Sequence, residues 1–320
     1  MPPMLVMLAS GHALTGPELA SELRVSRAAV WKQIEAWRKA GLDIASGPQG
    51  YRLARPLERL DVGRIRAALP DHARRRLGTL ENHWRLDSTS SELARRAAGL
   101  PDLSFVFADW QQAGRGRRGR QWLSPPAMNL QFSCLKRFAG GYAGLSGLSL
   151  ATGVAAARAL EDCGAPGIAL KWPNDLVHDD AKLGGILVEL GGEFMGPCHA
   201  IIGIGINVHL PEGVRAALDR PCTDLARLRG GDAPSRNVLA TALVARLVEA
   251  LETFDASGFA AFAQAWMARD ALVERRIRVE GAHGTFDGTA AGVDARGALR
   301  VRTPGGTRVI DSAEVTVRPE

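Results

Sequence analysis

Residues 111–122 read QQAGRGRRGRQW, and this stretch decides the interpretation of the fold more than any other in the chain of 320 residues. Its centre, residues 114–120, holds four arginines and three glycines. Glycine lets a backbone approach a ligand closely, and arginine binds carboxylate or phosphate oxygens in pairs. The loop is therefore suited to binding anions.

Two other interpretations of this loop have to be weighed. The letters match G-x-G-x-x-G at Gly114, Gly116 and Gly119, which marks a dinucleotide fold if a helix follows. The next residues, 121–126, include a tryptophan and two prolines, which do not start that helix. The other interpretation is a flexible basic loop. The loop follows an apolar strand predicted at 105–107, so we expect it to lie inside a folded domain.

Further polar groups lie at the ends of predicted strands downstream. The sequence Lys171-Trp172-Pro173-Asn174-Asp175 closes a strand predicted at 168–170, and Lys182 opens another at 182–190.

A third predicted strand, 200–208, alternates between two faces, with Gly203, Gly205 and Asn207 on one of them. These residues predict a flat floor on which a ring system lies. A close-packed or bulged core strand is the alternative for any single segment.

The sequence Asp87-Ser88-Thr89-Ser90 lies between a strand predicted at 81–86 and a helix predicted at 92–98. One interpretation is a capping box, with Thr89 as the N-cap and Glu92 completing it. The other is that these hydroxyls bind a polar ligand group at the helix N-terminus. The two interpretations are compatible.

The first 55 residues predict a winged helix-turn-helix. Thr15 and Glu18 form a capping box for a helix at 17–23, and Ser26 caps the next helix. In that helix Val30, Ile34 and Trp37 form one buried stripe, and residues 42–53 form the wing. A solvated helical surface is the alternative interpretation. The predicted DNA contacts are Ser26, Arg27, Ala28, Trp31, Lys32 and Arg52.

The rest of the chain divides into three parts. Residues 56–77 predict a linker helix, and residues 78–270 alternate strands and helices as a catalytic domain does. Residues 271–320 hold short alternating segments with turns at 280–281, 294–297 and 304–306, which predict a small β-barrel. The fold class is therefore α+β, with several domains.

Composition narrows the functional classes. The net charge of +6 suits a nucleic acid or an anionic substrate as the partner. Five of the 40 basic residues are lysines, so 35 are arginines, and the positive charge comes almost entirely from arginine. The four cysteines form no CxxC pair, which argues against a zinc site or a disulfide framework. Residues 1–10 lack a signal-peptide pattern, and no apolar run approaches the ~18 residues of a membrane span. We expect a soluble cytoplasmic protein.

Taken together, five motifs resemble the bifunctional biotin ligase and biotin operon repressor family, in the family's order and spacing. They are DSTS at 87–90, QQAGRGRRGRQW at 111–122, LKWPNDL at 170–176, KLGGILVEL at 182–190 and GIGINV at 203–208. SRAAVWKQI at 26–34 resembles the recognition helix of the same family. The resemblance covers nearly the whole chain. It implies a winged helix-turn-helix, a class II synthetase-like mixed sheet with helices, and an SH3-like β-barrel.

The resemblance also implies a reaction and its partners. ATP and Mg²⁺ activate biotin as biotinyl-5′-AMP, and a lysine of the biotin carboxyl carrier protein of acetyl-CoA carboxylase takes the biotin. The adenylate acts as corepressor, promoting a homodimer that binds the operator DNA of biotin genes. We expect the arginine loop to be mobile when empty and ordered over the adenylate.

Site residues follow from the same resemblance, motif by motif. The residues expected to bind biotin are Ser88, Thr89, Ser90, Gln111, Arg115, Gly116, Arg117 and Lys182. The residues expected to bind ATP are Arg118, Arg120, Trp122, Lys171, Asn174, Asp175 and Asn207. The catalytic set is Lys182, Arg115, Arg117, Arg118 and Asp175, with Asp175 as the magnesium ligand. The family usually has asparagine where Ser90 stands, so we expect a hydrogen bond to biotin to be lost or shortened.

Three rival functions remain. A lipoate or octanoate protein ligase shares the catalytic fold but has little need for the arginine loop or the N-terminal helices. A ligase without repressor activity is the second. A biotin sensor without enzymatic activity is the third, and the presence of Lys171, Asp175 and Lys182 argues against it.

Overall fold

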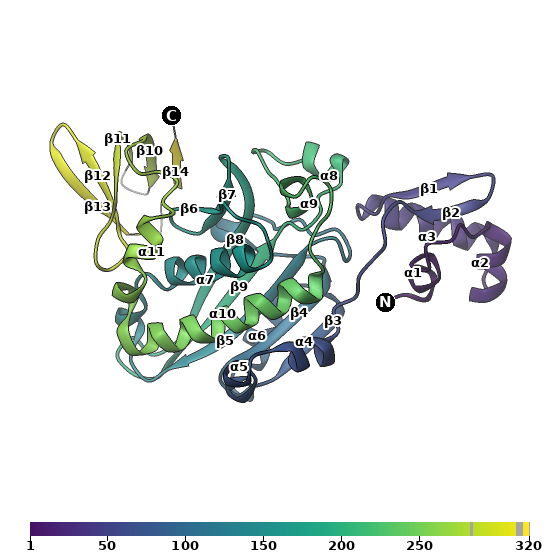
Figure 1. Ribbon diagram of the computed structural model, residues 1–320, viewed down its shortest axis with the longest axis horizontal. Coiled ribbons are helices and arrows are strands. Elements are labelled where there is room, and N and C mark those ends of the chain that lie inside the picture. The colour runs from purple at the N-terminus through teal and green to yellow at the C-terminus, as the bar shows by residue number, and fades with distance from the viewer. Residues whose placement is uncertain (282–283, 312–315, 320) are drawn as a thin grey trace.

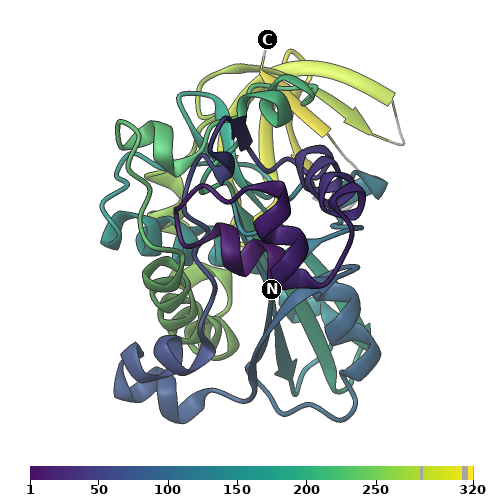
Figure 2. The same cartoon turned by 90° about the vertical axis from the view of Figure 1, so that its right-hand side faces the viewer.

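The computed structural model describes residues 1–281, 284–311 and 316–319. The predicted C-terminal domain therefore includes residues 282–283, 312–315 and 320, which lie outside the described residues. An N-terminal unit lies at one end of a larger central body, and a small sheet lies at the other end (Figure 1). In the turned view the N-terminal helices lie in front of that body (Figure 2).

The N-terminal unit has the predicted helices and wing. Thr15 caps α2 in a capping box with Glu18, and the Ser26 hydroxyl accepts from the Ala29 amide at 3.1 Å. The wing is an antiparallel hairpin, which confirms the prediction for residues 42–53. The elements are α1 (Pro3–Leu8), α2 (Gly16–Leu23), α3 (Arg27–Lys39), β1 (Ile44–Gly47) and β2 (Gly50–Leu53).

Trp37 departs from its predicted place in the stripe on α3. Val30 and Ile34 are buried within the N-terminal unit, whereas Trp37 is half-buried. Its ring lies edge-on to Trp84 and Trp110 of the central body, with centroids 6.3 and 5.6 Å away. Trp37 therefore belongs to the interface between the two units, which a helical period alone does not reveal.

The predicted single linker helix is wrong. Two short helices, α4 (Val62–Ala68) and α5 (Asp71–Arg76), occupy this region, separated by Leu69 and Pro70. Proline fixes φ, lacks an N–H and disfavours a helical conformation in the preceding residue. The helix therefore stops before Pro70 and starts again after it.

A seven-stranded mixed sheet forms the central body, in the order β3-β4-β5-β9-β8-β7-β6. Only β3 and β4 pair in parallel, and the other neighbours are antiparallel. The strands are β3 (Leu80–Leu86), β4 (Ser104–Gln111), β5 (Leu130–Phe138), β6 (Ala169–Lys171), β7 (Asp175–His178), β8 (Ala181–Gly192) and β9 (Cys198–Ile206).

Helices cover the two faces of this sheet unequally. The long helices α7 (Leu148–Asp162) and α10 (Arg236–Ser257) bury the face that carries Phe105 and Phe132. The short helix α6 (Thr89–Arg96) covers only part of the other face, where Leu93 contacts the cluster that includes Val106 and Ile201. Beyond Ile201, that face of β9 continues as Gly203 and Gly205.

A buried polar cluster joins the linker to the central sheet. Arg236, the first residue of α10, is 3% exposed and donates to the Asp109 carboxylate at 2.9 Å. Its Nη1 also donates to the Glu58 carbonyl, and the Glu58 carboxylate accepts from the side chains of Ser235 and Asn237. A buried charge is tolerated only with such partners. The cluster therefore fixes the path of the linker.

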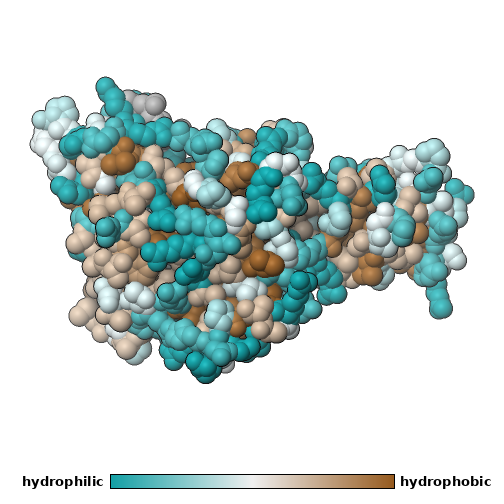
Figure 3. Space-filling view, in the orientation of Figure 1, coloured by the Kyte–Doolittle hydropathy of each residue, from teal (hydrophilic) through white to brown (hydrophobic). Residues whose placement is uncertain are grey.

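One segment, Tyr142–Asp162, is long and apolar enough to cross a membrane by length and composition alone. This corrects the expectation that no apolar run approaches that length. Its most apolar window is 67% buried inside the fold, as expected of a core helix. On the face shown in Figure 3, hydrophobic residues form small patches separated by hydrophilic ones.

The C-terminal unit is an antiparallel sheet in the order β13-β12-β11-β10-β14. Its strands are β10 (Arg276–Gly281), β11 (Gly284–Val293), β12 (Leu299–Thr303), β13 (Gly306–Ile310) and β14 (Thr316–Pro319), so the predicted turns at 294–297 and 304–306 separate strands. The Trp172 indole donates to the Gly297 carbonyl at 3.1 Å, which attaches this unit to the central body. The remaining helices are α8 (Glu212–Ala216), α9 (Leu225–Leu228) and α11 (Ala263–Met267).

Candidate functional site

A cavity of about 390 Å³ opens on the face of the sheet that α6 leaves partly uncovered. Every residue predicted from the motifs to bind biotin or ATP lines it, although these residues come from widely separated parts of the chain. They are Ser88, Thr89, Ser90, Gln111, Arg115, Gly116, Arg117, Arg118, Arg120, Trp122, Lys171, Asn174, Asp175, Lys182 and Asn207. The sheet brings them together, while their individual roles stay predictions.

Two glycines of β9 form the floor of the cavity. A Cβ atom at Gly205 would lie 2.5 Å from Cε2 of Trp122, and one at Gly203 would lie 2.8 Å from the Ser90 hydroxyl. The indole and the hydroxyl therefore lie directly over bare backbone. This agrees with the predicted flat floor and shows why larger residues do not fit there.

Hydroxyl groups gather at the N-terminus of α6. Ser88 is the N-cap, accepting from the Ser91 amide, so the predicted capping box with Thr89 and Glu92 is wrong. Thr89 is instead the first helical residue, and its amide and hydroxyl both donate to Gln111 Oε1, at 2.7 and 3.1 Å.

Ser133 is a further member of this hydroxyl group, and none of the motifs predicted it. Its hydroxyl lies 2.7 Å from that of Thr89 and 2.9 Å from that of Ser90. It lies in the middle of β5, paired with Gly203. Only the sheet register places it beside the start of α6.

The arginine loop is closed by its own backbone. Gly116 N donates to Arg120 O at 2.7 Å, and Trp122 N donates to Gly114 O at 2.8 Å. A single 3₁₀ turn, Arg117–Gly119, lies between them, so no dinucleotide-type helix follows. A Cβ at Gly114 would lie 2.6 Å from the Trp122 carbonyl, which explains the glycine.

Cations dominate the cavity. Lys182 Nζ lies 2.5 Å from Asp175 Oδ1, and Arg115 Nη2 lies 2.8 Å from Glu189 Oε2. Burial lowers the pKa of Lys171, and Asp175 opposes that change. Burial likewise lowers the pKa of the Arg117 guanidinium, again with Asp175 opposing. Crowding several cations around one carboxylate favours binding of an anion.

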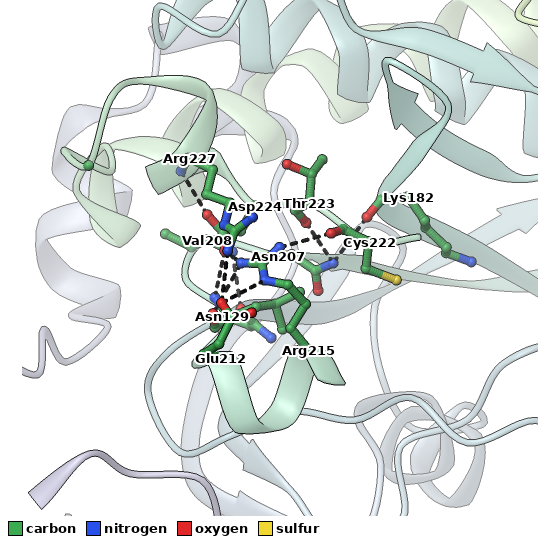
Figure 4. A network of polar contacts seen from close by, with 12 residues as sticks. Asn129, Lys182, Asn207, Val208, Glu212, Arg215, Cys222, Thr223, Asp224 and Arg227 are labelled. Atoms are coloured by element: carbon green, nitrogen blue, oxygen red, sulfur yellow. Dashed lines mark hydrogen bonds and ion pairs between the residues drawn. The ribbon is translucent and has the colours of Figure 1, made fainter. Parts of the chain in front are cut away.

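Two asparagines hold the backbone around the cavity (Figure 4). Asn207 Nδ2 donates to the carbonyls of Thr223, at 3.1 Å, and Lys182, at 3.4 Å. Asn174 Nδ2 donates to Ile186 O at 2.7 Å. Both residues thus shape the site, whatever they contact in a ligand.

Two carboxylates line the cavity, and Asp175, whose side chain is 18% exposed, lies deeper than Asp219, whose side chain is 87% exposed. Among the described residues, no group of three or more histidine, cysteine or acidic side chains is arranged to hold a metal. Magnesium is commonly bound by one or two carboxylates together with substrate phosphates. The donor set fits that mode and does not fit a cage made only of protein.

The residues predicted to contact DNA are all exposed, on α3 and on the wing. Trp31 is 58% exposed, and the other predicted contacts are also exposed: Ser26, Arg27, Ala28, Lys32 and Arg52. Arg38 differs, because its guanidinium donates to the Ile44 carbonyl at 2.6 Å and so fastens α3 to β1.

Comparison with known proteins covers all three units. Residues 4–52 match the model described as HTH domain, residues 84–207 match the Biotin/lipoate A/B protein ligase family, and residues 273–318 match the Biotin protein ligase C terminal domain. The chain is 34% identical over 316 residues to the Bifunctional ligase/repressor BirA of Salmonella typhimurium, covering 98% of this chain and 96% of that protein. The chain belongs to the bifunctional biotin ligase and repressor family.

Other members of this biotin ligase family agree. The Biotin–[acetyl-CoA-carboxylase] ligase of Paracoccus denitrificans is 35% identical, covering 72% of this chain and 97% of that protein. The structure of the biotin protein ligase from Aquifex aeolicus in complex with biotin and ATP has a TM-score of 0.64 and 27% identity, covering 76% of this chain and 99% of that one. The resemblance seen in the motifs is confirmed.

Proposed function

We propose that the protein joins biotin to ATP in this cavity, transfers the biotin to a lysine of a carrier protein, and acts as a biotin-responsive repressor. The observation that carries the ligase half is the convergence of all the predicted biotin- and ATP-binding residues on one cation-rich cavity. The repressor half rests on the exposed face of α3 and on the family.

The first step suits the groups present. A carboxylate oxygen of biotin forms a bond to the α-phosphorus of ATP, and the bond to pyrophosphate breaks. A carboxyl group with a pKa near ~4.3 is already ionised at pH 7 and needs no general base. The obstacle is repulsion between two anions, which Arg117 and Lys182 reduce by neutralising charge.

The cavity divides naturally between the two substrates. The hydroxyls of Thr89 and Ser90 lie with Gln111 over the Gly203 part of the floor and suit the polar head of biotin. Trp122, over the bare backbone of Gly205, suits the adenylate. Because Ser90 is shorter than the usual asparagine and its hydroxyl already contacts Ser133, we expect weaker biotin binding than in relatives with asparagine.

Asp175 is the residue that would hold magnesium, together with substrate phosphates. The ion would neutralise phosphate charge there. Asp175 also pairs with Lys182, whose Nζ lies 2.5 Å from Oδ1, so this carboxylate positions a cation of the cavity.

The second step and the partners are also proposals. The ε-amine of a carrier lysine forms a bond to the acyl carbon, and AMP leaves. The carrier is the biotin carboxyl carrier protein of acetyl-CoA carboxylase, by analogy with the Paracoccus relative. We place the reaction in the cytoplasm, without a membrane partner, and we propose that the C-terminal sheet closes as an SH3-like barrel.

Repression would need two copies of the chain. In the ladder of the described strands, β8 pairs with β9 as far as Gly192, whereas its pairing with β7 ends at Gly185. The edge at 187–192 can therefore meet a second copy. A homodimer formed over the adenylate would present two α3 helices to two half-sites of operator DNA.

The test of the ligase is biotin-dependent exchange of pyrophosphate into ATP, followed by transfer to a carrier domain. We expect Lys182→Ala and Arg117→Ala each to lower the exchange rate about 10²- to 10³-fold or to release the adenylate prematurely. Arg227→Ala is the control, because Arg227 is exposed and paired with Glu212. Near-normal carrier biotinylation in both cavity variants would contradict the site, and exchange driven by lipoate instead of biotin would favour the rival ligase.

A gel shift on the promoter of biotin genes tests the repressor. We expect a shift when both biotin and ATP are present and a weaker one without them. No shift in either state would leave the ligase alone.

A further inference from the structure

The chain between α8 and α9 returns to the cavity, and no motif predicted this. Residues 218–220 and Cys222 line the cavity beside Lys182 and Asp175. They lie more than thirty residues beyond Lys182 in sequence. The question is what this segment contributes to the site.

Backbone pairing fixes the segment to β8. Lys182 N donates to Pro221 O, and Thr223 N donates to Lys182 O, both at 2.9 Å. Cys222 and Lys182 thereby form a parallel β-bridge, and Asn207 fastens Thr223 from the other side (Figure 4). The segment is therefore held at the same residue whose side chain is a predicted catalytic cation.

Arg220 and Cys222 both line the cavity, on either side of Pro221. Arg220 Nη1 lies 3.6 Å from Asp175 Oδ2, while the other oxygen, Oδ1, accepts from Lys182. Arg220 also lies 3.6 Å from the Asp219 carboxylate, which is 87% exposed. A single half-buried carboxylate thus holds two cations at the edge of the cavity.

We propose that Arg220 binds a phosphate of the nucleotide substrate, acting beside Lys182. This rests on the proposed ligase function and adds a residue to its nucleotide site. The Arg220 side chain is 35% exposed at the cavity rim, so it can turn toward an incoming anion. A guanidinium can donate to two phosphate oxygens at once. The 3.6 Å contact to Asp175 does not use both of these donors.

The experiment is pyrophosphate exchange by the full-length protein with ATP and biotin varied separately. We expect Arg220→Gln to raise the KM for ATP about tenfold to a hundredfold, the usual range for a charge-assisted contact, with the KM for biotin unchanged. Arg220→Lys should fall between, because lysine keeps the charge but not the paired donors. Arg227→Gln, on exposed α9, is the matched control.

Two outcomes would overturn the proposal. An unchanged KM for ATP in Arg220→Gln is one, and an equal rise in the KM values for biotin and ATP is the other, because it assigns Arg220 to folding. If wild-type protein shows no exchange with biotin, the proposed function fails by itself. Calorimetric binding of inorganic pyrophosphate to wild type and Arg220→Gln then still tests Arg220, and equal affinity contradicts the inference.

Discussion

The cavity and the exposed face of α3 are both cationic surfaces, but they hold their cations differently. In the cavity, Lys182 and Arg115 are fixed by Asp175 and Glu189. On α3, Arg27 and Lys32 are exposed to solvent. Cations positioned in advance stabilise charge that develops during a reaction, whereas solvated cations supply affinity that depends on salt. Under the proposed function, the same residue types stabilise reacting charge in the cavity and bind DNA on α3.

The largest effect should follow from disturbing the cavity floor. Gly205→Val places methyl groups where the Trp122 indole lies, because even a Cβ would come within 2.5 Å of that ring. We expect pyrophosphate exchange to fall at least about 10²-fold, as misplacement by ~1 Å can do.

Gly213→Ala is the control for the floor variant, since a Cβ there meets nothing within 4 Å. Thermal unfolding of both variants separates loss of the site from loss of the fold. Normal pyrophosphate exchange by well-folded Gly205→Val would show that the cavity floor is not a binding surface. It would also contradict the contrast drawn between the cavity and the exposed face of α3.

A smaller effect should follow from changing the exposed face. The double variant Arg27→Ala and Lys32→Ala removes two solvated charges, so operator affinity should fall about tenfold and the salt slope of log K should flatten by about 1.8. Pyrophosphate exchange should stay normal. A measurable loss of exchange, or an unchanged salt slope, would contradict the separation of the two surfaces.

The smallest effect concerns the contact that joins the two regions. Trp37→Ala removes two edge-on aromatic contacts, to Trp84 and Trp110, each worth about 0.5–1.5 kcal/mol. We expect faster proteolysis between the N-terminal unit and the body, with the body still stable. Trp31→Ala, on the exposed face of the same helix, should leave proteolysis unchanged. Equal proteolysis rates of the Trp37→Ala and Trp31→Ala variants would contradict the conclusion that Trp37 stabilises the interface.

Local rules predicted much of the fold. The caps at Thr15 and Ser26 and the turns at 294–297 and 304–306 depend on residues close in sequence, so the local sequence was enough to predict them. The turn predicted at 280–281 was wrong, because both residues belong to β10. The cavity residues were predicted from the family resemblance of the motifs, and the sheet brings these motifs to one cavity. At residue 89 the local rule failed because Gln111, distant in sequence, engages the Thr89 hydroxyl.

What sequence could not predict depends on pairing between distant segments. Ser133 joins the hydroxyl group only through the register of β5 with β9. Arg220 reaches the cavity only through the bridge between Cys222 and Lys182. The Asp109–Arg236 pair closes across 127 residues and carries no local pattern. Each of these contacts forms only when the sheet is assembled, because its two partners are far apart in sequence.

The excess of arginine over lysine has a chemical consequence for an enzyme that makes a mixed anhydride. An amine with a free lone pair would take the biotin for itself, whereas a guanidinium stays protonated and grips the same anion without being acylated. Of the five lysines, Lys136 is buried between Asp102 and Asp255, and Lys182 is held by Asp175. Lys171 and Lys182 also line the cavity, but the four arginines of the loop at 114–120 bind the anion there without competing for the acyl group.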